Sequence, residues 1–128
     1  NDAFSDEHSG WHTEDLVTKF QIEREAQDAW AMRTQMRFGE AQAAGRFDAE
    51  IVSIEVPNPK YPIKFKKDEH NRPDTTIQSL AKLKPAFRKN GTITAGNAPG
   101  LNSGAADVIV ADARWAEKHN LQPMARLV

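Results

Sequence analysis

The 128-residue sequence has no cysteine, no long apolar run and no excess of basic residues. Without cysteine the chain has no disulfide scaffold and no cysteine nucleophile of its own, and its composition fits a reducing, cytoplasmic location. Its apolar runs fall well short of the roughly 20 residues that a helix needs to cross a bilayer. A formal net charge of -1 argues against general nucleic-acid binding, which requires a basic surface.

The composition is that of a folded protein. Hydrophobic residues make up 39% of the chain and charged residues 27%, without the low hydrophobicity of disordered segments. The acidic N-terminus lacks the apolar stretch of a signal peptide. The first residue is not methionine, and residues 124–128 resemble the start of a strand, so we expect an internal piece of a longer protein.

The first half of the sequence is predicted to be mainly helical. A short helix is expected to begin at residues 12–15, with Thr13 as its N-terminal cap. A longer helix is predicted from about residue 23 to 44, ended by a left-handed Gly45. Apolar residues at three- and four-residue spacings should form its packed face, with charged residues solvated on the other side. The packed face includes Trp30, Met32 and Met36, and the solvated residues include Arg24 and Asp28.

Two short strands and a third helix are predicted next. Residues 51–56 alternate with period two, as in a half-buried strand, and residues 63–66 alternate again and should pair with it. Thr75 and Gln78 fit a capping box that starts a helix, which should end before Pro85. The pair Asn90-Gly91 predicts a tight turn.

A glycine-rich loop precedes the last elements. Its glycines are followed by residues 105–111, which lack alternation and predict a strand covered on both faces. Asp112 can cap a helix that runs to about His119 and ends at a left-handed Asn120, and a final strand should follow Pro123. The predicted fold is therefore α+β, largely helical, with a small hairpin and a terminal strand–helix–strand unit.

Three features of the sequence have both a functional and a structural interpretation. His8 and His12 have a spacing that can bind zinc, but Gly10 lies between them and no third ligand is evident. The loop glycines fit neither nucleotide-binding fingerprint, so close packing and positive φ angles are the simpler explanation. A basic region is either a solvated face or a receptor for a phosphorylated ligand. The loop glycines are Gly96, Gly100 and Gly104, and the basic residues are Lys66, Lys67, Arg72, Lys82, Lys84, Arg88 and Lys89.

Several segments resemble the thiolases, the acetyl-CoA acetyltransferases and 3-ketoacyl-CoA thiolases. They cover nearly the whole chain in the family's order: Thr13-Glu14-Asp15-Leu16, residues 24–31, residues 41–47, Arg72-Pro73-Asp74-Thr75-Thr76, and the stretch LAKLKPAF…GTITAGNAPG. The resemblance implies the α/β thiolase fold. It assigns residues 1–104 to the loop-domain region, 105–123 to the last strand and helix of the N-terminal half, and 124–128 to the start of the C-terminal half.

The resemblance also implies a reaction. Thiolases cleave 3-ketoacyl-CoA with coenzyme A (CoA), or condense two acyl-CoA molecules, through a nucleophilic cysteine and a second cysteine that acts as acid and base. This chain contains neither cysteine, so we expect it to be inactive alone, with no catalytic residue and no metal site. CoA and acyl-CoA are expected as substrates rather than as bound cofactors, and other thiolase subunits are expected as partners in a tetramer.

The same resemblance implies a CoA-binding wall. His8 matches the family histidine beside the pantetheine and acyl region, and Arg72 matches an arginine near the nucleotide end. The other implied binding residues are Ser79, Leu83, Phe87, Ala95, Gly96 and Pro99. Ser79 and Leu83 are expected to share one side of a helix because they are four residues apart.

Two positions depart from the family pattern. Pro99 replaces a serine that contacts CoA in many thiolases, and proline offers neither a hydroxyl nor an N–H group. Trp11 replaces a small residue and either alters substrate length or packs outward. The alternative function is a CoA-binding or oligomerisation module without chemistry, and the sequence leaves the acyl chain length and the preferred direction of the reaction open.

Overall fold

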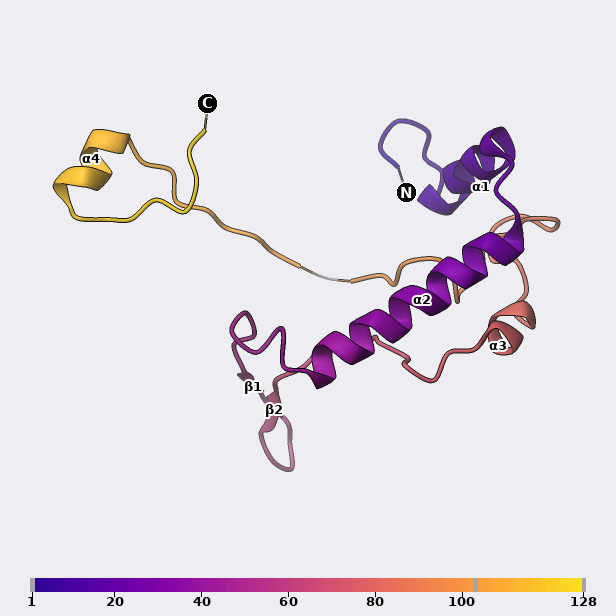
Figure 1. Ribbon diagram of the computed structural model, residues 1–128, viewed down its shortest axis with the longest axis horizontal. Coiled ribbons are helices and arrows are strands. Elements are labelled where there is room, and N and C mark those ends of the chain that lie inside the picture. Colours follow the sequence, from indigo (N-terminus) through magenta and orange to yellow (C-terminus); the bar gives the residue numbers. More distant parts are fainter. Residues whose placement is uncertain (1, 103, 128) are drawn as a thin grey trace.

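The computed structural model describes residues 2–102 and 104–127. These residues form four helices and one antiparallel two-stranded sheet. In Figure 1, α2 is the long central element, α1 and α3 lie near one of its ends, and the β1–β2 hairpin lies near the other. An extended segment leads away to α4, which is separate from the other helices. The elements are α1 (Ser9–Phe20), α2 (Arg24–Ala43), β1 (Ile54–Val56), β2 (Ile63–Phe65), α3 (Ile77–Ala81) and α4 (Ala113–Lys118).

Helices α2 and α4 confirm the sequence-based boundaries to within one residue. Gly45 has a φ of 67° and Asn120 a φ of 56°, so both have the left-handed conformation predicted after these helices. Asp112 caps α4 by accepting hydrogen bonds from the backbone N–H groups of Arg114 and Trp115. Local signals therefore account for the C-terminal ends of both helices and for the start of α4.

The predicted start of α1 is wrong by about four residues. The helix begins at Ser9, and His8 is its cap: its Nδ1 atom accepts a hydrogen bond from Gly10 N at 3.1 Å. Thr13 lies inside the helix, and its hydroxyl donates to the carbonyl of Ser9 at 3.0 Å. An imidazole cap is not among the preferred cap residues, which explains why the pattern pointed to threonine instead.

The capping box of α3 is displaced by one residue. Thr76 and Ser79 form it reciprocally, in place of the predicted Thr75 and Gln78. The Thr75 hydroxyl instead donates to the carbonyl of Arg72 at 2.7 Å. Either of the adjacent threonines could cap the helix. In the structure Thr76 is the cap, and Thr75 bonds to Arg72 instead.

The packed face of α2 is not the predicted one. Asp28 and Ala31 are buried, whereas Trp30 is 63% exposed and Met36 45% exposed. The guanidinium of Arg33 lies over the Trp30 ring, 4.1 Å from its centroid. Helix α2 turns its polar side inward because that side bonds to the backbone of residues 80–97.

Asp28 is the centre of this polar contact. It accepts hydrogen bonds from Arg24 Nε at 2.8 Å and from Asn97 Nδ2 at 2.9 Å. Arg24 also donates to the carbonyls of Leu80 at 2.8 Å and Leu83 at 3.1 Å. These bonds join α2 both to the end of α3 and to the loop that follows it.

Glu14 makes the corresponding contact from α1. Its carboxylate is buried and accepts hydrogen bonds from the backbone N–H groups of Thr92 at 3.1 Å and Ile93 at 3.0 Å. Buried apolar side chains, Leu80 and Ile93, lie among the polar ones. The interior of this part of the molecule is therefore largely a hydrogen-bond network.

The hairpin has the predicted antiparallel pairing but lacks the predicted burial. Ile54 pairs with Phe65 and Val56 with Ile63. All residues of both strands are exposed, because no second layer covers the sheet within the described residues. The prediction of a half-buried strand is therefore wrong for this chain.

The predicted strand over residues 105–111 is also absent. Val108, Ile109 and Val110 are 86%, 98% and 72% exposed, and residues 105–111 have no regular secondary structure. A strand requires backbone partners, and among the described residues the only paired strands are β1 and β2. Residues 124–127 likewise form no strand, and Val128 lies outside the described residues.

No helix among the described residues has the length and apolarity required to cross a membrane.

We expect Glu14→Gln to lower the free energy of unfolding of the intact protein by about 1–3 kcal/mol, because an amide NH₂ would face backbone N–H donors. Urea unfolding of the full-length protein measures the change. Glu25→Gln, an exposed position in the first turn of α2, is the matched control and should stay within about 0.5 kcal/mol. Equal effects at both positions would contradict the assigned role of Glu14.

Candidate functional surface

His8 and Phe87 come together although they are far apart in the sequence. Their rings stack with centroids 4.8 Å apart and planes 28° apart. Gly10 permits this contact, since a Cβ atom there would collide with the Phe87 ring. The cap of α1 thus contacts the segment that follows α3.

Gly96 approaches the leucines of the α3 region. A Cβ atom at Gly96 would lie 2.5 Å from Leu80 Cδ2 and 2.6 Å from Leu83 Cδ1. The glycine is therefore required for close packing, as predicted. The prediction of positive φ is wrong for the loop, because Gly45 is the only glycine with positive φ among the described residues.

The turn around Gly96 is held by its own hydrogen bonds. Asn97 Oδ1 accepts from Thr94 N at 2.7 Å, and Thr94 Oγ1 accepts from Gly96 N at 3.2 Å. Thr94 is completely buried. Ala95 and Pro99 on either side of this turn are exposed, so the loop presents a short stretch of backbone at the surface.

Ser79 and Leu83 do not share a helix side, because α3 ends at Ala81. The Ser79 hydroxyl accepts from Thr76 N at 3.0 Å and donates to Thr76 O at 2.7 Å. It is thus part of the helix cap while remaining exposed. The expectation of one shared helical surface is wrong.

Arg72 is exposed and lies on a segment anchored to α2. Its backbone N–H donates to Gln35 Oε1 at 2.8 Å, and Asn71 Nδ2 donates to the same oxygen at 2.8 Å. Asn71 Nδ2 also lies 2.9 Å from the carbonyl of Gln35. The backbone beside Arg72 is therefore well fixed.

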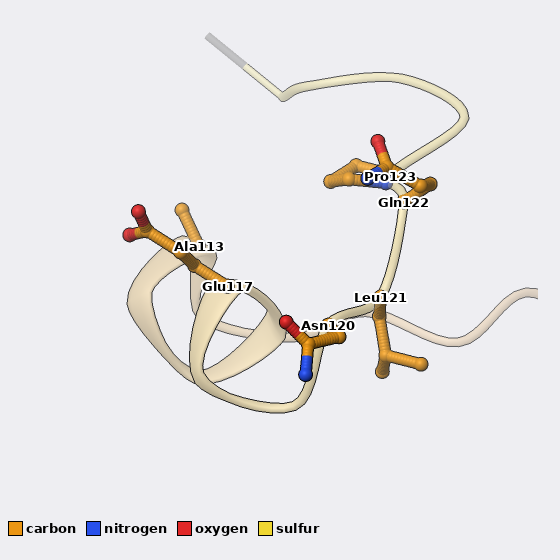
Figure 2. Close-up of a pocket in the computed structure, with 6 residues that line it drawn as sticks. All are labelled: Ala113, Glu117, Asn120, Leu121, Gln122 and Pro123. Carbon is orange, nitrogen blue, oxygen red and sulfur yellow. The ribbon is translucent and has the colours of Figure 1, made fainter.

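Two hollows in the part of the chain that the structure describes are not lined by the predicted binding residues. One hollow, of about 300 Å³, lies beside α4 and is lined by residues that include Glu117, Asn120 and Leu121 (Figure 2). The other, of about 440 Å³, lies between α2 and residues 68–71. Six of the eight predicted binding residues are exposed, so they lie on the open surface.

The N-terminal histidines make contacts with neighbouring groups. His12 Nε2 lies 2.8 Å from Ser5 Oγ, and Asp2 accepts hydrogen bonds from the N–H groups of Phe4 and Ser5, which lower the pKa of its carboxyl. Within the part of the chain that the structure describes, no three His, Cys, Asp or Glu side chains are grouped as metal ligands.

The sequence indicates Arg88 only as part of a basic region, but the residue has specific partners in the structure. It forms an ion pair with Asp15 at 2.7 Å and lies over the Trp11 ring, 5.0 Å from its centroid. The roles of Glu14, Asp28 and Asn97 were also not predicted. Their partners lie 69 to 79 residues away, so no local spacing could reveal these contacts.

Comparison with known proteins identifies the family. The model of the thiolase N-terminal domain matches residues 1–114. The chain belongs to the thiolase family. Its relatives include a probable acetyl-CoA acyltransferase of Staphylococcus epidermidis, 49% identical over 98% of this chain, and an acetyl-CoA acetyltransferase of Allochromatium vinosum, 48% identical over 99%.

Solved thiolase structures have the same fold over this segment. The acetyl-CoA acetyltransferase of Bacillus anthracis matches 96% of this chain with a TM-score of 0.86 and 41% identity, covering 31% of that protein's chain. Human mitochondrial 3-ketoacyl-CoA thiolase matches 86% with a TM-score of 0.70 and 44% identity, covering 28% of its chain. The chain spans 32% of the length of each of the two bacterial relatives.

We expect Gly96→Ala to lower the free energy of unfolding of the full-length thiolase by about 1–3 kcal/mol, because the new methyl group overpacks against two leucines. Gly104→Ala is the matched control, since nothing lies within 4 Å of its Cβ position. Adding Leu83→Ala to Gly96→Ala should recover part of the loss, as a double-mutant cycle by thermal unfolding would measure. Strict additivity would contradict the packing contact.

Proposed function

We propose that this chain is the CoA-binding segment of a thiolase that cleaves 3-ketoacyl-CoA with CoA or condenses two acyl-CoA molecules. The proposal is supported by the names of the relatives, which are acetyl-CoA acyltransferases and acetyltransferases. The chain has no cysteine, so the nucleophilic cysteine and the acid/base cysteine would belong to other parts of the full-length protein. The segment itself would bind and orient the substrate.

One observation carries the assignment of the surface. The His8–Phe87 stack and the Leu83–Gly96 contact bring α1, the segment after α3 and the glycine loop together. These two contacts involve four residues implied by the family resemblance: His8, Leu83, Phe87 and Gly96. Residues 83–96 connect the two contacts along the chain. Apolar side chains beside exposed backbone suit pantetheine, which has apolar stretches and amide groups.

The surface has two chemically different ends. We assign His8 and Phe87 to the pantetheine and acyl end, with Leu83 and the backbone of Ala95 and Gly96 along the pantetheine. Arg72 is assigned to the nucleotide end, where an exposed guanidinium can bind phosphate oxygens in a bidentate manner. The assignment is completed by Ser79, whose exposed hydroxyl can bond to the ligand, and by Pro99, which can contribute only apolar contact and its carbonyl.

The domain division is part of the same proposal. Residues 1–104 would form the loop-domain region, although Asn1 and Ser103 lie outside the described residues. Residues 105–123 would complete the N-terminal half, where the exposed apolar segment of residues 108–111 would pair as a strand in a sheet. A homotetrameric assembly and a cytoplasmic location are proposed on the family resemblance.

The full-length protein tests the proposed activity directly. We expect CoA-dependent loss of acetoacetyl-CoA absorbance, which reports cleavage to acetyl-CoA. Absence of turnover, with CoA binding retained in calorimetry, would favour the alternative of a non-catalytic CoA-binding or oligomerisation module. The flanking reading frame gives an independent check, since the catalytic thiolase must encode the missing cysteines.

We expect Arg72→Ala to raise the KM for CoA roughly tenfold and to leave kcat nearly unchanged, because one charge-assisted hydrogen bond contributes about 1.5–3 kcal/mol. The increase should shrink at high salt concentration, because ions screen exposed charges. Arg37→Ala, at an exposed position on α2, is the control and should leave KM unchanged. An unchanged KM for Arg72→Ala would remove this residue from the binding surface.

A further inference from the structure

Trp11 is held in a fixed orientation beside the His8–Phe87 contact. The guanidinium of Arg88 lies over the indole, and Arg88 Nη2 donates to the Trp11 carbonyl at 3.2 Å. The same nitrogen lies 2.7 Å from Asp15 Oδ1. One guanidinium nitrogen of Arg88 thus contacts two groups of α1, and the indole remains 38% exposed.

His8 and Trp11 belong to the same edge of the molecule. His8 caps α1 and Trp11 lies in its first turn, where the Trp11 N–H donates to the His8 carbonyl at 2.8 Å. Their partners, Phe87 and Arg88, are consecutive in the sequence. Gly10 lies between them and is buried under Phe87, so the two aromatic contacts are adjacent.

We infer that Trp11 determines substrate specificity by restricting the acyl group to short chains. The inference rests on the proposed function, which assigns the His8 end of the surface to the acyl end of the substrate. The contact with Arg88 favours this position of the indole, so the ring occupies space that a longer acyl chain would need. Specificity by exclusion of this kind acts on substrate length and leaves CoA recognition unchanged.

Trp30 provides a matched control within the same chain. It is also an exposed tryptophan under a guanidinium, with Arg33 Cζ 4.1 Å from the ring centroid. It lies on the exposed face of α2, away from the α1 contacts with Phe87 and Arg88. Replacing it removes the same chemistry without changing the proposed acyl end.

The test compares kcat/KM of the full-length protein for 3-ketodecanoyl-CoA and acetoacetyl-CoA. We expect Trp11→Ala to raise the long-to-short ratio by roughly 10–200-fold, the range for one or a few methylene groups in an apolar pocket. Trp11→Met, which keeps more apolar volume, should give a smaller rise. Trp30→Ala should leave the ratio unchanged.

The inference would be overturned if the long-to-short ratio of kcat/KM were unchanged in both Trp11 variants. An equal loss of kcat/KM with both substrates would also overturn it, as would a rise in the KM for free CoA without a change in the ratio. A second measurement separates this failure from that of the proposed function. If the unmodified protein turns over neither substrate, the reaction proposal fails, and the ratio of Kd values for decanoyl-CoA and acetyl-CoA still tests Trp11. In that measurement Trp11→Ala should favour decanoyl-CoA, and an unchanged Kd ratio would overturn the inference.

Discussion

The buried carboxylate of Glu14 is the interaction on which this structure most depends. It accepts the backbone N–H groups of Thr92 and Ile93, which lie in a loop without a sheet partner for those donors. A buried N–H group left unpaired costs free energy comparable to a lost hydrogen bond. The carboxylate of Glu14 therefore takes the place of a sheet partner for these two donors. Asp28 fixes the same loop from α2 by accepting a hydrogen bond from the side-chain amide of Asn97.

This polar network explains how an open surface can still be well ordered. Arg24 connects Asp28 to the carbonyls of Leu80 and Leu83, which fixes the chain where it leaves α3. The chain then continues to Phe87, whose ring stacks on His8 and so contacts the start of α1. The candidate surface is therefore positioned by hydrogen bonds where the chain leaves α3 and by ring stacking at Phe87, as binding groups on loops require.

Local signals predicted the helix of residues 24–43, the cap at Asp112 and the left-handed residues Gly45 and Asn120, because each depends on neighbours in sequence. Long-range contacts explain the failures. The apolar stripe with Trp30 stays exposed since Asp28 needs partners about 70 residues away, and residues 105–111 lack a strand partner among the described residues. The candidate site residues came from family resemblance, and spacing placed Ser79 and Leu83 on one helix wrongly.

Gly96 shows why the packing and binding interpretations of the glycine loop are compatible. Its missing side chain lets Leu80 and Leu83 approach the loop backbone, which is a structural role. The same contact holds the turn of Thr94 and Asn97 close to the leucines, so that the backbone beside Ala95 is exposed at a defined position. A backbone that must be both close to the protein and accessible to a ligand favours glycine for both reasons. The packing of Gly96 against the two leucines thus holds the loop backbone in the position proposed for contact with pantetheine.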